Sequence, residues 1–344
     1  MALLYQRLLL PLLTLPEAEV SHNLILRLLQ LASPLAGALQ PANYPRLRVS
    51  AFGLEFPNPI GLAAGFDKNG VAVPALAALG FGHVEVGTVT PRPQPGRSRP
   101  RLFRLAKDRA LINRLGFPSR GAEAVARNLS RLKNRRFVLG VNVGPNAGSV
   151  GVEDFVQAAT MVAPYADYLT INVSSPNTAG LRGMQQAETL AGLLAALDWL
   201  DKPLLVKISP DLSDGELHEI LDVLCAKAVA GVVVANTTVD RPPHLQASAD
   251  GGLSGRPLRE RATQLVSKAY RHTAGKLPII GVGGVATAQD ALDKIEAGAC
   301  LVQLYTGFVY QGPFVARDIA LGLVRELERR GAGSIQGLIG SASD

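Results

Sequence analysis

The sequence predicts an α/β protein, a (βα)₈ barrel with a small helical extension at its N-terminus. Eight short apolar segments alternate with stretches long enough to form helices. Nearly every apolar segment ends in polar or glycine-rich residues, and barrels assemble their sites at these carboxyl ends of the strands. The 344 residues suffice for one barrel of about 250 residues and the extension. Periodicity alone leaves an open doubly wound sheet as the alternative.

The first 40 residues differ in composition from the rest. "MALLYQRLLLPLLTL" is rich in leucine and is interrupted by Pro11. In "TLPE", Thr14 and Glu17 predict an N-cap and a capping box. Beyond them, apolar residues recur at helical spacing at Val20, Leu24, Leu28 and Leu31. We expect a pair of short amphipathic helices over 1–40 that packs on the main domain or lies in a membrane interface.

The main domain is expected over 46–336, after a linker, "QPANYPRLR", with prolines at 41 and 45. It opens on a predicted hairpin, "LRVSAFGLEFPNP". The eight strand candidates that follow are 59–64, 83–88, 137–143, 168–173, 204–209, 231–236, 278–284 and 301–306. "FVARDIALGLVREL" supplies the helix after the last strand.

The formal net charge of +7 is concentrated in one segment. Residues 92–136 contain fourteen Lys or Arg against Asp108 and Glu123. This excess indicates either an anionic partner (a phosphate ligand, a membrane surface or nucleic acid) or a solvated basic face. Two distant cysteines and five scattered histidines indicate neither a disulfide framework nor a metal site. No apolar stretch reaches the ~20 residues of a membrane-spanning helix.

Two glycine strings close the last two strand candidates, "GVGG" at 281–284 and "YTG" at 305–307. Barrels often bind a phosphate at this place, although each string is also typical of a tight turn. Lys207 lies within an apolar strand, where a buried ammonium calls for an anionic ligand or a structural ion pair.

Asparagines recur at the predicted strand ends and in loops nearby. An amide both donates and accepts hydrogen bonds, which suits a flat heterocycle with alternating carbonyl and N–H groups. Each asparagine alone is also typical of a turn. The set is Asn113, Asn142, Asn172, Asn177 and Asn236. "SSPN" at 174–177 has no persuasive order of histidine and acid partners, so hydrolysis is not expected.

A family resemblance rests on an ordered set of motifs from about Gly61 to Gly312. They are "GLAAGFDKNG", "GTVTPRPQPGRSRPRLFRL", "LINRLGF", "NVSSPNTAGLR", "KISPDL", "ANTTVDR", "GGLSGRPL" and "IIGVGG". Together they closely resemble class 2, quinone-dependent dihydroorotate dehydrogenase. The resemblance implies an FMN-containing barrel that oxidises (S)-dihydroorotate to orotate in UMP biosynthesis and passes the electrons to a membrane quinone.

The resemblance also implies the residues of the site. FMN is expected to contact Ala64, Gly65, Phe66, Asp67, Lys68, Thr88, Asn142, Asn172, Lys207, Ala235, Gly255, Gly284, Tyr305 and Thr306. Orotate is expected to contact Lys68, Asn113, Arg114, Leu115, Gly116, Phe117, Asn172, Asn177, Asn236 and Thr237. Ser175 is expected to be the base that removes a proton from carbon 5 while hydride leaves carbon 6. Class 1 enzymes use cysteine there, so serine favours class 2. Thr178 is a candidate for the proton relay.

The quinone is expected between the N-terminal helices and the barrel, at His22 and Arg104. Residues 1–40 would hold the protein peripherally on the cytoplasmic side of the cell (inner) membrane. The sequence departs from the family pattern before the histidine, in "LPEAEVSH", and at Ala235, which replaces a hydroxyl residue often found there.

Two alternative functions involve partners other than a quinone. One is a soluble FMN barrel with another acceptor, such as fumarate or NAD. The other is a flavin-free barrel that binds RNA or phosphate through 92–136, which the low aromatic content of 5% and the absence of an RNA-binding motif disfavour. We therefore expect no nucleic-acid partner.

Overall fold

Eight parallel strands close into a barrel. The computed structural model describes residues 5–36, 43–132, 135–243, 245 and 249–343. The barrel strands are β3 (Ile60–Leu62), β4 (His83–Val89), β7 (Val138–Val143), β8 (Tyr168–Asn172), β9 (Leu204–Ile208), β10 (Gly231–Val234), β12 (Ile279–Val282) and β13 (Leu301–Leu304). Their order around the barrel is β10-β12-β13-β3-β4-β7-β8-β9. All eight predicted segments form these strands. The barrel is confirmed and the open sheet is wrong.

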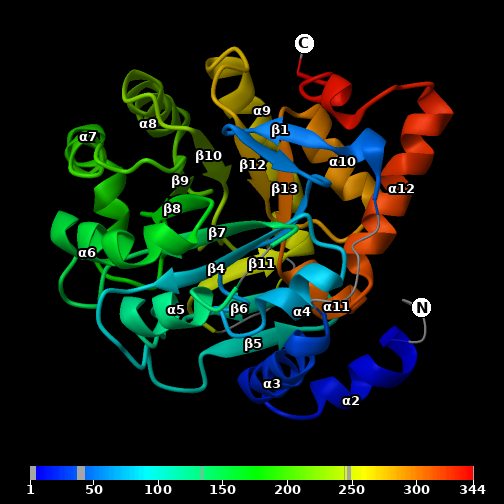
Figure 1. Ribbon diagram of the computed structural model, residues 1–344, viewed down its shortest axis with the longest axis horizontal. Coiled ribbons are helices and arrows are strands. Elements are labelled where there is room, and N and C mark those ends of the chain that lie inside the picture. The colour runs from blue at the N-terminus through cyan, green and yellow to red at the C-terminus, as the bar shows by residue number, and fades with distance from the viewer. Residues whose placement is uncertain (1–4, 37–42, 133–134, 244, 246–248, 344) are drawn as a thin grey trace.

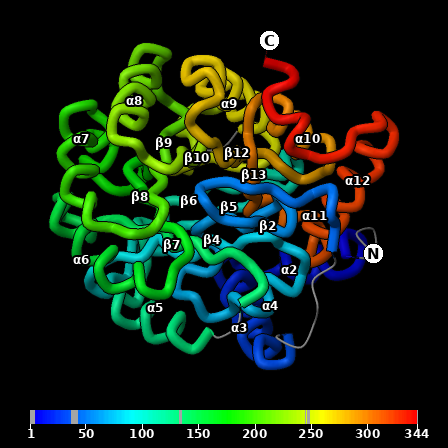
Figure 2. The backbone as a smooth tube through the Cα atoms, turned by 45° about the horizontal axis from the view of Figure 1, so that its top comes forward, coloured from blue at the N-terminus to red at the C-terminus, as the bar shows by residue number. Residues whose placement is uncertain are grey.

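Helices ring the barrel on its outside, as Figure 2 shows. They are α4 (Val73–Ala78), α5 (Ala122–Leu129), α6 (Val152–Val162), α7 (Ala187–Ala195), α8 (Asp214–Ala226), α9 (Arg259–His272), α10 (Ala288–Glu296), α11 (Thr306–Gln311) and α12 (Val315–Arg330). Capping boxes start two of them: Ser213 with Glu216 at α8, and Thr287 with Asp290 at α10. The 3₁₀ turns are η2 (Pro45–Leu47), η3 (Ala163–Tyr165), η4 (Leu181–Gln185), η5 (Arg256–Leu258) and η6 (Ile335–Leu338).

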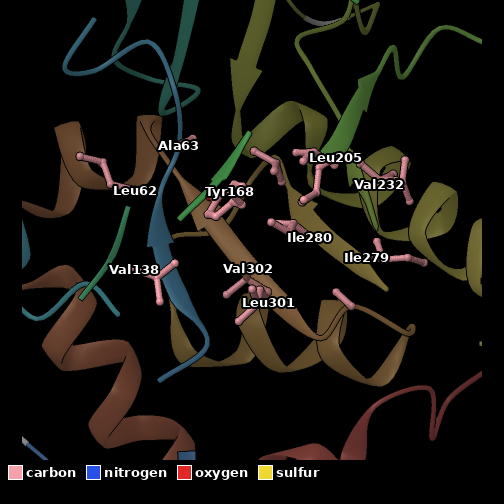
Figure 3. Packing of buried hydrophobic residues seen from close by; sticks show 14 of the residues in the cluster. Leu62, Ala63, Val138, Tyr168, Leu205, Val232, Ile279, Ile280, Leu301 and Val302 are labelled. Carbon is pink, nitrogen blue, oxygen red and sulfur yellow. The ribbon is translucent and has the colours of Figure 1, made fainter. Parts of the chain in front are cut away.

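The barrel strands are apolar along nearly their whole length because helices and the barrel interior bury both of their faces. Leu205, Ile280 and Val302 are fully buried, and Figure 3 shows them packed among neighbouring strands. The predicted hairpin is confirmed as β1 (Val49–Ala51) and β2 (Leu54–Phe56). Its Phe52 and Phe56 contact Tyr168 and His83, the first residues of β8 and β4. The hairpin therefore closes the amino-terminal end of the barrel.

A second, three-stranded antiparallel sheet was not predicted. It consists of β5 (Leu102–Leu105) and β6 (Ala110–Asn113), from the β4–α5 connection, and β11 (Gly252–Gly255), from the β10–α9 connection. These connections leave the carboxyl ends of their strands, so the sheet lies over the barrel mouth. It encloses the space in which a site is expected.

The N-terminal extension is helical, as predicted, and lies beside α4, α11 and β5 (Figure 1). It consists of the π-helical turn η1 (Tyr5–Leu9), α2 (Leu10–Thr14) and α3 (Ala18–Ala36), and α3 is longer than expected at 19 residues. The predicted capping box is wrong. Thr14 is the last residue of α2, four positions before α3, and its hydroxyl donates to the carbonyl of Pro11 (2.8 Å).

The exposed side of the extension is rich in leucine. Leu24, Leu28, Leu31 and Leu35 of α3 are each at least half exposed. Among the described helices, none is long and apolar enough to cross a bilayer. Residues 37–42 of the predicted extension and linker lie outside the described residues, and Pro45 begins η2.

His83 predicts how stability depends on pH. It is fully buried, its two ring nitrogens have no hydrogen-bond partner among the described residues, and burial lowers its pKa from 6.5 to about 3. Between these values the unfolded chain binds a proton that the folded chain does not, so stability falls as pH falls from 6.5 towards 3. The expected loss from this one group is about 2 kcal/mol between pH 7 and pH 5.

Urea unfolding of the parent and of His83→Leu at pH 7 and pH 5 checks this prediction. Burial also lowers the pKa of His22 to about 3, so the parent should lose roughly twice as much stability as His83→Leu. Equal losses in the two proteins would contradict the assignment to His83.

Candidate functional site

A cavity lies at the barrel mouth, between the carboxyl ends of the strands and the β5–β6–β11 sheet. It encloses about 1060 Å³, counting the part open to solvent. Nineteen of the predicted site residues line it. They are Ala64, Gly65, Lys68, Thr88, Asn113, Leu115, Gly116, Phe117, Asn172, Ser175, Asn177, Lys207, Ala235, Asn236, Thr237, Gly255, Gly284, Tyr305 and Thr306.

At one end of the cavity, two positions accept only glycine. Gly255 and Gly284 have φ of +93° and +75°. A Cβ at Gly255 would lie 2.3 Å from the carbonyl oxygen of Arg109, and one at Gly284 would lie 2.4 Å from the Cα of Arg259. Beside them, the hydroxyls of Ser254 and Thr306 are hydrogen-bonded (2.8 Å). This end presents backbone and hydroxyl groups at close range, as a phosphate requires.

Lys207, from β9, supplies a buried cation to the cavity. It is 5% exposed and no hydrogen bond is assigned to its ammonium within the described part of the chain. Desolvation lowers its pKa, and the negative charge of Glu85 acts in the opposite direction. A buried ammonium of this kind favours a ligand with negative charge.

A row of amides crosses the floor of the cavity. Asn236 donates through Nδ2 to Oδ1 of Asn172 (3.2 Å), and Asn172 donates through Nδ2 to Oδ1 of Asn142 (3.3 Å) and to the hydroxyl of Thr88 (3.1 Å). Thr88 in turn donates to Oδ1 of Asn142 (2.7 Å). Because their neighbours hold them, these amides are pre-oriented for a polar planar ligand.

A second pair of amides lies under the β5–β6–β11 sheet, which forms the roof of the cavity: Asn113 is the last residue of β6, and Asn177 lies in the loop after β8. Asn177 donates through Nδ2 to both the backbone oxygen and Oδ1 of Asn113 (3.1 Å each). Asn113 donates to the carbonyl of Gly252 in β11 (3.3 Å). The β5–β6–β11 sheet therefore positions the amides of Asn113 and Asn177 at the cavity.

The two adjacent serines have different surroundings. Ser175 lines the cavity, and its hydroxyl oxygen accepts from the backbone N–H of Asn177 (3.3 Å). The Ser174 hydroxyl donates to Oδ1 of Asn172 (3.0 Å) and accepts from Asn236 (2.9 Å), so it belongs to the amide row. Thr178 is buried nearby, but no hydrogen bond joins its hydroxyl to that of Ser175 in the described residues.

Lys68 provides a second cation at the cavity wall. Its ammonium donates to the carbonyl of Gly65 (2.6 Å). Desolvation lowers its pKa from 10.5 to about 8, and the carboxylate of Glu19 limits the shift. Lys68 is therefore charged at neutral pH and loses its charge in mildly alkaline solution.

Four of the residues expected to contact FMN or orotate do not line the cavity. Asp67 is fully buried in its own turn, where it accepts from the backbone N–H groups of Val71 (3.1 Å) and Ala72 (2.7 Å). Asn142 lies behind Thr88 and Asn172. Arg114 points away, donating to the carbonyl of Pro100 and lying over the Phe103 ring. Phe66 faces a second cavity instead.

The second cavity lies between α3 and the barrel. His22, Phe66, Lys68 and Tyr305 line it, and Lys68 and Tyr305 also line the first cavity. The His22 ring packs edge-on against Phe66 (4.9 Å between centroids). Burial, and next the charge of Lys68, lower the pKa of His22 to about 3, so the ring is neutral. Arg104 is not in this group; it donates to the carbonyls of Leu13, Thr14 and Pro16 between α2 and α3.

A buried ion pair that the sequence did not predict fixes α3 to the barrel. Arg101 binds both carboxylate oxygens of Glu19 (2.9 and 2.7 Å) and also donates to the carbonyls of Pro95 and Arg97. The hydrogen bond from Arg101 holds the pKa of Glu19 below its usual range. Part of the basic segment 92–136 is thus structural, and most of its other arginines are exposed.

Sequence reasoning also missed Glu85 and the apolar lining from Leu102, Leu111, Leu258, Val282 and Leu304. Glu85 had a detectable signal, an acid between two valines of the predicted strand "HVEVGT". The donor set as a whole (glycine cradle, buried lysine and oriented amides) fits the flat, phosphate-bearing FMN that the resemblance implies.

Comparisons with known proteins agree on one family. Residues 46–327 match a family model described as "Dihydroorotate dehydrogenase". A Roseiflexus protein named "Dihydroorotate dehydrogenase (quinone)" is 48% identical over 96% of each chain. One of the same name from Anaeromyxobacter dehalogenans is 48% identical over 94% of this chain and 93% of the relative. The crystal structure of Eimeria tenella DHODH with ferulenol has a TM-score of 0.89 at 39% identity, covering 95% of this chain and 96% of that one.

Proposed function

The chain belongs to the dihydroorotate dehydrogenase family, and from this premise we propose that it oxidises dihydroorotate to orotate in pyrimidine biosynthesis and passes the electrons to a quinone. The observation that carries the proposal is one cavity that holds a glycine cradle, two lysines, paired amides and Ser175. The family is flavin-dependent, and we assign the flavin as FMN, one per chain. When bound, FMN supplies the acceptor for the hydride from carbon 6.

The residues assigned to FMN form two groups, one suited to its phosphate and one suited to its ring. Gly255, Gly284, Tyr305 and Thr306 form the end suited to the phosphate. Thr88, Asn172, Ala235 and Lys207 line the part suited to the ring. Backbone of 64–68 contributes as well, while the Asp67 side chain stabilises that turn and Asn142 supports the amides from behind. Lys207 provides a positive charge where negative charge develops.

The substrate is held by charge and by amides. Lys68 binds the carboxylate, and Asn113, Asn172, Asn177, Asn236 and Thr237 surround the pyrimidine edges, with the backbone of 114–117 closing the wall. Floor and roof amides are already oriented by their neighbours. A pre-oriented site binds the planar substrate with little loss of side-chain freedom.

Ser175 acts as the base. It accepts the proton from carbon 5 and passes its own hydroxyl proton on, with Thr178 as a candidate relay member. A hydroxyl is a weak base in water, so it needs a substrate that becomes more acidic as hydride departs. Ser175 lines the cavity whereas Ser174 is bound within the amide row, which supports the assignment to Ser175.

The N-terminal extension, residues 1–40, serves the quinone and the membrane, and residues 46–336 form the FMN domain. His22 of α3 lines the second cavity, and Arg104 supports the turn between α2 and α3. The exposed leucines of α3 form a face that suits the membrane interface. We place the protein peripherally on the cytoplasmic side of the cell membrane.

A spectroscopic experiment tests the function. The purified protein should be yellow, dihydroorotate should bleach the flavin absorption under anaerobic conditions, and a quinone in lipid vesicles should restore it. In Leu28→Glu/Leu31→Glu we expect unchanged bleaching, loss of vesicle binding and at least tenfold slower recovery with the vesicle quinone, because two apolar anchors are replaced by charges.

The matched control is Trp199→Glu. Trp199 is also an exposed apolar residue (51% exposed), and it lies between α7 and β9. It should behave as the parent does. A colourless protein without flavin would refute the function. Recovery with fumarate or NAD instead of quinone would favour the soluble rival.

A further inference from the structure

Glu85 of β4 is a buried acid below the cavity that the reaction described above does not use. It is fully buried and accepts hydrogen bonds from four side chains on three other strands. Asn142 donates to Oε1 (2.9 Å), while Tyr168 (3.1 Å), Thr170 (3.3 Å) and Gln303 (2.9 Å) donate to Oε2. Four donors directed at two oxygens match the acceptor-only pattern of a carboxylate.

Glu85 ends a one-directional chain of amides. The Nδ2 of Asn236 donates to Asn172, that of Asn172 donates to Asn142, and that of Asn142 donates to Glu85. A carboxylate at the end leaves Asn142 one orientation, with its NH₂ towards Glu85, and each preceding amide is then determined by the next. The direction in which Asn172 and Asn236 face the cavity is thus linked to Glu85.

Glu85 also acts on Lys207. Its negative charge counters the effect of desolvation on the pKa of Lys207. Lys207 pairs in register with Asn172 across β8 and β9, so the lysine and the amide chain meet at the same level of the barrel. The negative charge of Glu85 therefore stabilises the positive charge of Lys207. Both groups are buried, and electrostatic interactions are strong where there is little water.

We propose that Glu85 is a positioning residue that orients the Asn142–Asn172–Asn236 amides and, as counter-charge to Lys207, sets the electron affinity of the bound flavin. The proposal rests on the function proposed above. Removing the negative charge makes the cavity more positive and should shift the flavin reduction equilibrium towards uptake of electrons.

Glu85→Gln isolates the charge because the neighbours can satisfy an amide there. The Oε1 of Gln303 has no hydrogen-bond partner among the described residues. A rotated Gln303 amide can present this oxygen to the new NH₂ of residue 85, whose remaining oxygen still accepts from Asn142. Thr170→Val is the matched control, since it removes one hydrogen bond to Glu85 with little change in volume and none in charge.

The midpoint potential of the bound flavin, measured by equilibration with a reference dye, tests the proposal. We expect Glu85→Gln to raise it by a tenfold shift in the two-electron equilibrium, about 30 mV. Thr170→Val should leave it unchanged. Orotate affinity, read from the flavin absorption, should fall about tenfold in Glu85→Gln because the amides lose their fixed direction.

Separate results overturn the inference and the function. If the flavin binds and dihydroorotate bleaches it, but its potential is the same in Glu85→Gln and in the parent, the role of Glu85 is refuted and the function is not. A protein that binds no flavin overturns the function. If Glu85→Gln does not fold, Glu85→Asp decides, because its shorter side chain keeps the charge but withdraws it from Asn142. A parental potential together with about tenfold weaker orotate binding supports the proposal, and parental orotate binding refutes it.

Discussion

Ser175→Ala will keep the flavin bound and will slow its bleaching by dihydroorotate by about 10²–10⁴-fold, the usual contribution of a positioned proton acceptor. Ser175 lines the cavity, and within the described part of the chain its hydroxyl has one hydrogen bond, which it accepts from the backbone N–H of Asn177. Alanine removes the acceptor without disturbing the glycine cradle or Lys207. Flavin binding, and with it the yellow colour, should therefore be retained.

Ser174→Ala is the matched control from the same turn. Its hydroxyl joins Asn172 to Asn236, so its loss should loosen the amide row and slow bleaching by no more than about tenfold. Stopped-flow absorbance under anaerobic conditions measures both variants. Equal rates in the two variants would refute the assignment of Ser175 as the base.

The barrel could be predicted because its signals are local. Each strand is a short apolar run, and the residues that follow it carry the site, so order along the chain already determined which residues would meet at the mouth. Lys207 is an example. Its buried position within β9 followed from its apolar neighbours, and the structure places it 5% exposed at the cavity.

The features that the sequence did not predict depend on residues that are far apart in the sequence. Glu19 and Arg101 are separated by 82 positions, and neither has a local pattern that indicates a buried pair. The β5–β6–β11 sheet likewise joins segments from two connections about 140 residues apart, each too short to be distinguished from a loop. Such pairings become apparent only when the barrel brings the connections together.

Local patterns also misled where two interpretations compete. "TLPE" has the form of a capping box, yet Thr14 ends α2 because the turn after it, held by Arg104, delays the next helix to Ala18. Motif membership assigned Asp67 and Arg114 to the site without saying which of their atoms contribute, and their side chains point away from the cavity. A motif identifies the segment that lies at a site but not the direction of every side chain.

Lys68→Met should lower kcat/KM for dihydroorotate by about 10- to 10²-fold, because a charge-assisted hydrogen bond to the carboxylate contributes about 1.5–3 kcal/mol. The control Lys227→Met removes an exposed lysine after α8, on the opposite side of the barrel from the mouth, and should have the parental value. A similar loss in both variants would indicate a general effect of charge rather than a contact with the substrate.

The pH dependence gives the stronger test of Lys68. Its pKa in the free protein is about 8, lowered first by desolvation. Only the protonated amine attracts the substrate carboxylate, so kcat/KM should be constant below pH 7 and should fall about tenfold per unit above pH 8, since this parameter reports groups of the free enzyme. In Lys68→Arg the guanidinium remains charged over this range, so the alkaline fall should disappear even if the rate is lower. An unchanged alkaline fall in Lys68→Arg would assign it to another group and remove the carboxylate-binding role from Lys68.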